Sequence, residues 1–178
     1  GGQRIEQLGR LTRSDLDSDL DCVRIRDSKG RRKAARIHDV PLIPAALEAL
    51  QEMGCEVGPY LFTVTHGESG AVYATVQHRV RAIAVDMQES GELEKGLFTV
   101  GDLRRTVETR LSAAGLQPHE LAQLQSHGLG GVQVRHYNKH DYLQEKRVAL
   151  ETLFQLLTGK VGTVTTIKRN RVSAGARG

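Results

Sequence analysis

The sequence contains little cysteine and no long apolar run. Its two cysteines, Cys22 and Cys55, are too few for a disulfide framework and lack the spacing of metal ligands, which favours a reducing compartment. No run of residues approaches the length of a membrane span, and no signal peptide is visible. We therefore predict a cytoplasmic protein without a membrane partner, and the chain has no internal repeat.

The length of the chain limits the number of domains, and its charge indicates the kind of partner. A chain of 178 residues, 39% of them hydrophobic, can form one core of ordinary size, so we predict one domain over residues 1–158 and a basic tail over residues 159–178. The net charge of +4 and the isoelectric point near 9.3 suit a polyanionic partner. Seven basic residues against one acid, Asp27, lie in residues 24–36, and five basic residues without an acid follow Glu151. Both segments are predicted phosphate-contact surfaces.

Hydrophobic periodicity predicts a mainly α-helical fold with a small antiparallel β-sheet, which is an α+β class. Apolar and basic residues alternate on either side of a turn at residues 28–30, and this pattern is typical of a β-hairpin with one basic face. Its apolar face is expected to hold Val23, Ile25, Ala35 and Ile37, and its basic face Arg24, Arg26, Arg36 and His38. Helices are predicted over residues 4–12, from Pro44 to residue 54, over 74–88, from residue 99 to Gly115, over 118–125, and from Leu143 through Leu153.

The helix that follows residue 99 has the clearest start in the sequence. Thr99 as N-cap and Asp102 three residues later form a variant of the capping box, and flanking apolar residues can form a hydrophobic staple. We expect its buried face to hold Leu103, Val107, Leu111 and Ala114. Arg104 then lies beside this face, close to the helix N-terminus, where backbone N–H groups and the helix dipole favour a phosphate.

Three residue types in the second half of the chain suit tyrosine attack on a phosphodiester. A guanidinium such as that of Arg104 can hold the non-bridging oxygens while negative charge builds up in the transition state. Tyr137 can form a covalent phosphotyrosine, and it needs a cationic site or a base because the unperturbed pKa of tyrosine is about 10. His127 lies upstream of it, and the glycine-rich segment 128–131 allows the chain to fold back between them.

With these motifs, the chain from Gly2 to about Phe154 resembles the catalytic domain of tyrosine recombinases, the phage integrase family, whose motif runs R…K…HxxR…H…Y. The matching segments are GGQR, DSKGRR, DLRRT, LQSHG and RHYNKHDY, in the family's order. The resemblance implies the catalytic residues Arg4, Lys29, Arg104, His127 and Tyr137. Other DNA contacts are expected from Arg24, Arg26, Arg31, Arg32, Lys33 and Arg105.

The resemblance also implies a reaction: site-specific DNA recombination or integration, as in mobile elements. Tyr137 would attack the scissile phosphate to give a 3′-phosphotyrosyl link, and Lys29 would protonate the leaving 5′-oxygen. Arg4, Arg104 and His127 would hold the non-bridging oxygens, and no metal or other cofactor is needed. The expected partner is double-stranded DNA, with four protomers acting on two duplexes and the chain alone monomeric or weakly associated. The chain would be a fragment of a bacterial or phage protein that lacks its upstream DNA-clamping domain.

Two positions depart from the family pattern. Gly101 stands where the HxxR motif has histidine, so the usual proton acceptor is absent and a water or His136 would have to replace it. Gln7 stands where the family tends to carry an acidic residue three positions after the first arginine, so an amide would have to orient Arg4. The predicted site is therefore recognisable but incomplete.

Several alternatives remain open at this stage. Tyr142 competes with Tyr137 as nucleophile, although an aromatic residue at the start of a helix is more often part of a core, and Arg104 could merely pair with Glu108 one helical turn away. Four other histidines are interpreted as structural or surface residues: His38, His66, His78 and His119. The alternative functions are a type IB topoisomerase, a weakened recombinase that only binds DNA, and a basic interaction domain.

Overall fold

The computed structural model describes residues 1–27, 35–52, 58–127 and 140–159. In chain order the elements are α1 (Ile5–Leu8), a 3-10 turn (Arg13–Asp15), β1 (Leu16–Asp17), β2 (Cys22–Asp27), β3 (Arg36–Pro41), α2 (Pro44–Glu52), α3 (Tyr73–Glu89), α4 (Val100–Ala113), α5 (Pro118–Gln125) and α7 (Leu143–Thr158). This arrangement confirms the predicted class, mainly α with a small antiparallel sheet.

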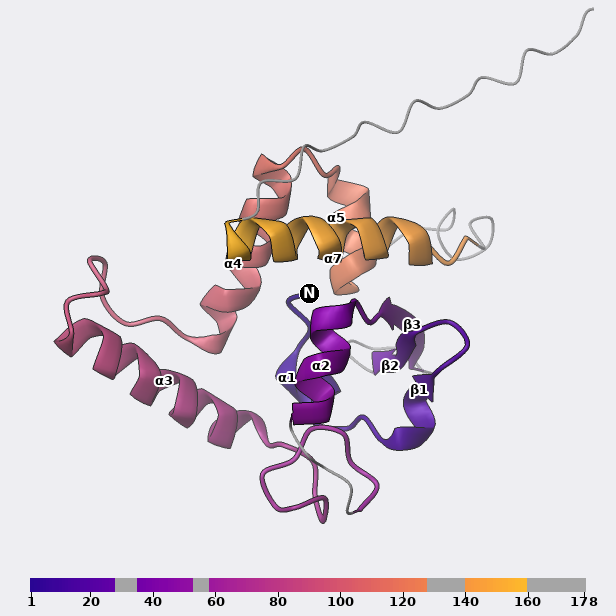
Figure 1. The fold of residues 1–178 in the computed structure, drawn as a ribbon, viewed down its shortest axis with the longest axis horizontal. Coiled ribbons are helices and arrows are strands. Elements are labelled where there is room, and N and C mark those ends of the chain that lie inside the picture. Colours follow the sequence, from indigo (N-terminus) through magenta and orange to yellow (C-terminus); the bar gives the residue numbers. More distant parts are fainter. Residues whose placement is uncertain (28–34, 53–57, 128–139, 160–178) are drawn as a thin grey trace, which may run out of the picture.

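The elements form two groups around a shared core (Figure 1). The sheet, α1 and α2 make one group, and α4, α5 and α7 make the other, with α7 packed against β3 and crossing both α4 and α5. The shared core contains buried side chains from both groups, among them Ile25, Leu111, Leu124 and Leu150. Within the described residues, no helix is long and apolar enough to cross a membrane.

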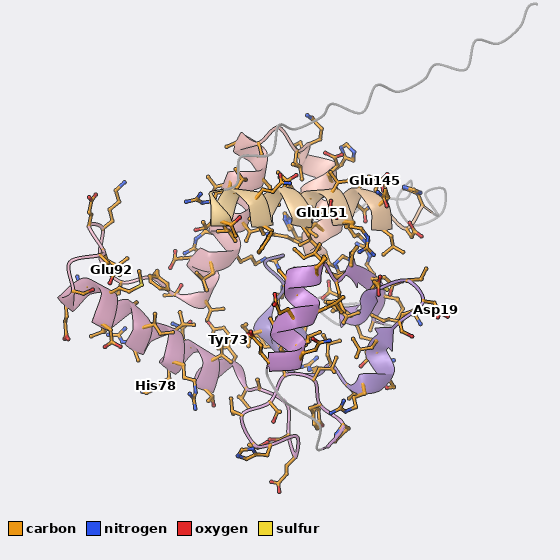
Figure 2. The ribbon with its side chains drawn as sticks, viewed as in Figure 1. Asp19, Tyr73, His78, Glu92, Glu145 and Glu151 are labelled. Carbon is orange, nitrogen blue, oxygen red and sulfur yellow. The ribbon has the colours of Figure 1, made fainter. Side chains whose placement is uncertain are left out.

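The helix α3 extends away from both groups, and the chain returns from its far end to α4 (Figure 1). Ala84 is its one buried residue among those described, and the side chain of His78 projects outward (Figure 2). The predicted helix over residues 74–88 is therefore confirmed, but it contributes little to the core.

The sheet has the strand order β1-β2-β3, with both pairs antiparallel. Along β2 the predicted alternation is confirmed, because Val23 and Ile25 are buried whereas Arg24 and Arg26 are exposed. The prediction for β3 is wrong: His38 is buried opposite Ile25, whereas Ile37 is 51% exposed. The physical reason is a hydrogen bond from the ring of His38 to a carbonyl of α5, which draws the histidine to the core face.

A local signal accounts for the start of α4. The capping box of α4 is present: Thr99 N donates to the Asp102 carboxylate at 2.8 Å, and Asp102 N donates to Thr99 Oγ1 at 3.3 Å. The Thr99 hydroxyl, which donates to the Asp102 carboxylate at 2.7 Å, and the Thr99 N–H lower the pKa of Asp102 to about 2, and Arg105 lowers it further. The helix predicted over residues 4–12 is shorter than expected and covers only Ile5–Leu8.

One expected core residue of α4 is exposed. Leu111 is fully buried and Val107 packs against the core, as predicted, but Leu103 is 48% exposed. Leu103 lines an apolar cavity of about 440 Å³ together with Phe154 and Leu157 of α7. The helix therefore faces the rest of the molecule over its second half, whereas its first turn borders this opening.

Candidate active site

The candidate site is built around the C-terminal end of α5. Pro118 lies in the first turn of this helix and the Gln117 N-H is capped by Glu120 at 2.8 Å, so the helix begins where the sequence predicts. It ends at Gln125, because Ser126 adopts the left-handed conformation with φ 52° and ψ 50°. A non-glycine residue in this conformation is uncommon, and here the Ser126 side chain is buried.

The last carbonyl groups of α5 bind side chains from distant parts of the chain. Leu124 O accepts from Gln3 Nε2 at 2.7 Å and lies 2.9 Å from His38 Nε2. Gln125 O accepts from Arg104 Nη2 at 2.8 Å. Since these carbonyls have no partner within the helix and form its negative end, they are natural acceptors for a cation.

Arg104 is half-buried, and its guanidinium is fixed by backbone carbonyls. Besides Gln125 O, it donates to Gly2 O, and Gln125 Nε2 donates back to Arg104 O at 3.3 Å. Burial lowers the pKa of Arg104 from its ordinary value, and the charge of Arg4 lowers it further. The alternative of a simple pair with Glu108 therefore does not describe its hydrogen bonds, which go to carbonyl groups on two other segments.

Arg4 precedes α1, and its guanidinium also lies near the C-terminal end of α5. Its Nη1 lies 3.4 Å from Asp27 Oδ1, and the second oxygen of Asp27 accepts from Ser126 Oγ at 2.8 Å. The side chains of Arg4 and Asp27 are 22% and 6% exposed. Among the described contacts, Arg4 pairs with Asp27 and not with the amide expected at position 7, and Gln7 Nε2 is buried without a hydrogen-bond partner among the described residues.

His127 directly follows the α5 turn. Its backbone N–H donates to Ala122 O at 3.2 Å, which fixes the chain where it leaves the helix. Its Nε2 lies 3.7 Å from Glu108 Oε1 and makes no hydrogen bond within the described part of the chain. The structure thus brings Arg4, Arg104 and His127 to one end of α5, although they are far apart in the sequence.

Lys29 and Tyr137 lie outside the residues that the structure describes. The same holds for four other residues named from the sequence: Arg31, Arg32, Lys33 and His136. The described residues on both sides of segment 128–139 are anchored to β3: His38 binds the end of α5, and Lys146 of α7 donates to Asp39 O at 2.8 Å and to Asp141 O at 2.9 Å. Glu145 lies near the start of α7 (Figure 2). It pairs with His140 at 2.8 Å.

Tyr142, the alternative nucleophile, is the N-cap of α7 with φ 57°, and its ring contacts that of His140 at a centroid distance of 4.6 Å. Gly101 lies in the first turn of α4, where a Cβ would meet Arg105 and Thr99 atoms only at 3.5 Å. This is ordinary contact, so the backbone at position 101 has room for a side chain.

The described DNA-contact candidates lie on exposed surfaces and are paired with acids. On the outer face of β2, Arg24 pairs with Asp39 at 3.1 Å and Arg26 with Asp15 at 2.8 Å. Arg105 pairs with Asp102 on α4 and is 71% exposed. The basic face predicted for the hairpin is thus partly neutralised in its described part.

The sequence interpretation missed two residues of the site, Asp27 and Ser126. Asp27 is the last residue of β2 and points to the core side, in register with the buried Val23 and Ile25. An acid on the apolar face of a strand is a signal of a buried partner, because an unpaired charge there is costly. Ser126 precedes His127 in the LQSHG motif but carries no such signal.

Comparison with known proteins shows the family and the fold of this chain. Residues 1–144 match the model of the phage integrase family. No protein of curated function matches the sequence. Among solved structures, the fold is similar to the Tn1549 transposon integrase (residues 82–397) in complex with transposon right-end DNA, with a TM-score of 0.59 and 19% identity over 86% of this chain and 55% of that chain.

The fold is also similar to the XerA recombinase, with a TM-score of 0.55 and 20% identity over 88% of this chain and 53% of that chain. This chain therefore spans about half the length of the structures it resembles. Because the family model covers most of the sequence, the chain belongs to the phage integrase family.

Proposed function

We propose that this chain carries the catalytic site of a site-specific tyrosine recombinase, which cleaves and rejoins DNA. The observation that supports this most directly is the convergence of Arg4, Arg104 and His127 at the end of α5. Two guanidinium groups and an imidazole at one place form a clamp for the non-bridging oxygens of a phosphodiester. Arg104 is suited to this role because backbone carbonyls, rather than a carboxylate, hold its guanidinium.

The proposed chemistry forms one bond and breaks one at each step. The Tyr137 hydroxyl gives its proton to a water or to His136, and its oxygen attacks phosphorus and forms a 3′-phosphotyrosyl bond. The bond to the 5′-oxygen breaks, and that oxygen takes a proton from Lys29. A 5′-hydroxyl of another strand then attacks the phosphotyrosine and releases the tyrosine. Arg4, Arg104 and His127 stabilise the charge on the equatorial oxygens in both steps.

Substrate and assembly belong to the same proposal. The Tn1549 integrase structures contain DNA, and the net positive charge of this chain suits the same polyanion. We take residues 1–158 as the catalytic domain and residues 159–178 as a basic tail. Four protomers would act on two duplexes, and an upstream DNA-clamping domain would belong to the whole protein.

Covalent trapping tests the enzyme directly. Duplexes recovered by binding from a random-sequence library would be incubated with the protein and run on a denaturing gel. We expect labelled DNA to stay attached to the wild type and to be released from Tyr137→Phe, since phenylalanine lacks the nucleophilic oxygen. Tyr142→Phe is the matched control and should still trap. Trapping that survives in Tyr137→Phe and is lost in Tyr142→Phe would contradict the assignment.

The second candidate is a recombinase homologue that only binds DNA, and Gly101 favours it. General acid–base assistance contributes about 10²–10⁴-fold, so its loss slows the reaction without removing the phosphate clamp. Since a Cβ fits at position 101, Gly101→His can be built into α4. If the wild type binds DNA without trapping and Gly101→His traps, the protein is a binding homologue with a repairable site. Relaxation of supercoiled DNA without a defined site would instead indicate a type IB topoisomerase.

A further inference from the structure

We propose that Asp27 is the positioning residue of the phosphate clamp, and that it replaces the acid missing at position 7. This inference rests on the proposed function, because it assigns a role within that site. Asp27 is the only acid in the basic segment 24–36, and its carboxylate is buried between α5, β2 and the residue before α1.

The two oxygens of Asp27 hold two different parts of the clamp. Oδ1 faces Arg4 Nη1 at 3.4 Å, and Oδ2 accepts from Ser126 Oγ at 2.8 Å. Ser126 is the residue that turns the chain out of α5, and His127 is the next one. One carboxylate therefore links the position of the first arginine to the backbone turn that carries the histidine.

The left-handed turn at Ser126 makes this link specific. A non-glycine residue with φ 52° carries backbone strain and persists where its surroundings hold it. The hydrogen bond to Asp27 is the one described contact that fixes the Ser126 side chain, which is 5% exposed. Asp27 thus stabilises the turn from the side chain, while the His127 N–H bond to Ala122 O stabilises it from the backbone.

Charge supports the same assignment. Burial and the charge of Arg4 lower the pKa of Arg104, whereas Glu108 and Asp27 act in the opposite sense, so the two acids offset the repulsion between the two guanidinium groups. Of these acids, Asp27 is the one that pairs with Arg4, whereas Glu108 faces the His127 ring at 3.7 Å. The two arginines can therefore lie close together before DNA binds.

A matched acid elsewhere in the chain provides the control. Asp15 is buried like Asp27 and pairs with Arg26 at 2.8 Å, but this pair lies on the outer side of the sheet. Asp27→Asn and Asp15→Asn each remove one buried charge with little change of shape. A merely structural effect would appear in both variants, whereas a positioning effect would appear only in Asp27→Asn.

The first measurement is single-turnover cleavage. We expect Asp27→Asn to slow cleavage roughly 10- to 100-fold with little change in DNA affinity, because a displaced arginine loses transition-state contacts. In the Arg4→Ala background, Asp27→Asn should slow cleavage by a smaller factor than it does in the wild type, since part of its effect acts through Arg4 and the rest through the Ser126 turn. Asp15→Asn should cleave at the wild-type rate. An Asp27→Asn rate equal to that of the wild type would overturn the inference and leave the proposed function standing.

The second measurement does not depend on activity. In protein labelled with ¹⁵N-arginine, the guanidinium signal of Arg4 is identified by its loss in Arg4→Lys. Rotation of this guanidinium should be slow in the wild type and in Asp15→Asn, and fast in Asp27→Asn. Unchanged rotation in Asp27→Asn would overturn the inference. If the wild type does not trap DNA, the proposed function fails, and this measurement still decides whether Asp27 positions Arg4.

Discussion

Two ion pairs of similar composition lie at opposite sides of the sheet and behave differently. At the α5 end, the Arg4–Asp27 pair has side chains that are 22% and 6% exposed. On the outer face of β2, the Arg26–Asp15 pair combines an equally buried acid, 2% exposed, with an arginine that is 62% exposed. Burial of the arginine fixes its direction, whereas an exposed arginine can turn toward a second anion from the solvent side. The first geometry suits chemistry on one phosphate, and the second suits adjustable contact with a DNA backbone.

The largest effect is expected from a change of Arg104, the second arginine at the α5 end, whose guanidinium is held by two backbone carbonyls. We expect Arg104→Ala to reduce the trapping rate by about 10²–10³-fold, the effect of removing one preorganised donor from a transition state. It also leaves Gly2 O and Gln125 O without this donor, so the melting temperature should fall. Single-turnover trapping and thermal unfolding measure the two effects separately.

Arg105→Ala is the control for this experiment, because the neighbouring arginine points to solvent. Arg104→Lys separates folding from chemistry: the ammonium keeps the charge but cannot bond two carbonyls and a phosphate with one planar fork. If Arg104→Ala trapped DNA as fast as Arg105→Ala, the α5 end would not be the catalytic clamp.

The comparison also shows which features the sequence can predict. The starts of α4 and α5 follow from local signals, a capping box and a proline in the first turn, so the predictions at these positions are confirmed. The position of His38 depends on Leu124, which is 86 residues away, and a strand pattern of alternating residues carries no information about such a partner. The role of Asp27 likewise depends on the approach of α5 to β2. Local structure was therefore predictable, whereas the polar contacts that assemble the site were not.

The second prediction concerns the pH dependence of the α5 end. Burial lowers the pKa of His38 to about 3, and the nearby charge of Lys146 acts in the same direction; Arg36 lowers it further, while Asp27 and the Leu124 carbonyl raise it. The unfolded chain has an ordinary histidine pKa of about 6.5, so it binds a proton that the folded chain does not. This contribution to stability is complete above pH 6.5 and is lost as the pH falls toward 3.

At pH 5 the expected loss is about 2 kcal/mol of unfolding free energy relative to pH 7, since each pH unit below 6.5 costs about 1.4 kcal/mol. His38→Gln keeps a donor toward Leu124 O and removes the titration, so its stability should fall less between pH 7 and pH 5. His119→Gln, at an exposed position, should keep the wild-type slope. Urea unfolding at pH 7, 6 and 5 measures this, and equal slopes in all three proteins would show that His38 is protonated in the fold.

The smallest effect on the cleavage rate is expected from a change of Arg26, on the outer face of β2. Arg26 is 62% exposed, so its guanidinium can also face a DNA phosphate, while Thr12 donates to the buried Asp15 carboxylate from the protein side. We expect Arg26→Ala to weaken binding to all duplexes alike and to reduce the slope of log affinity against log salt concentration by about 1. At saturating protein the single-turnover rate should stay the same, because Arg26 makes no contact with the α5 end in the described structure.

Arg4→Ala should give the opposite result, a lower rate at saturation with a small change in affinity, because one phosphate contact among many contributes little to binding and much to the transition state. Fluorescence anisotropy over a range of salt concentrations gives the slope, and single-turnover trapping gives the rate. If Arg26→Ala slowed cleavage at saturation as much as Arg4→Ala does, exposure of the arginine would not distinguish the two pairs. Both faces of the sheet would then belong to one catalytic surface.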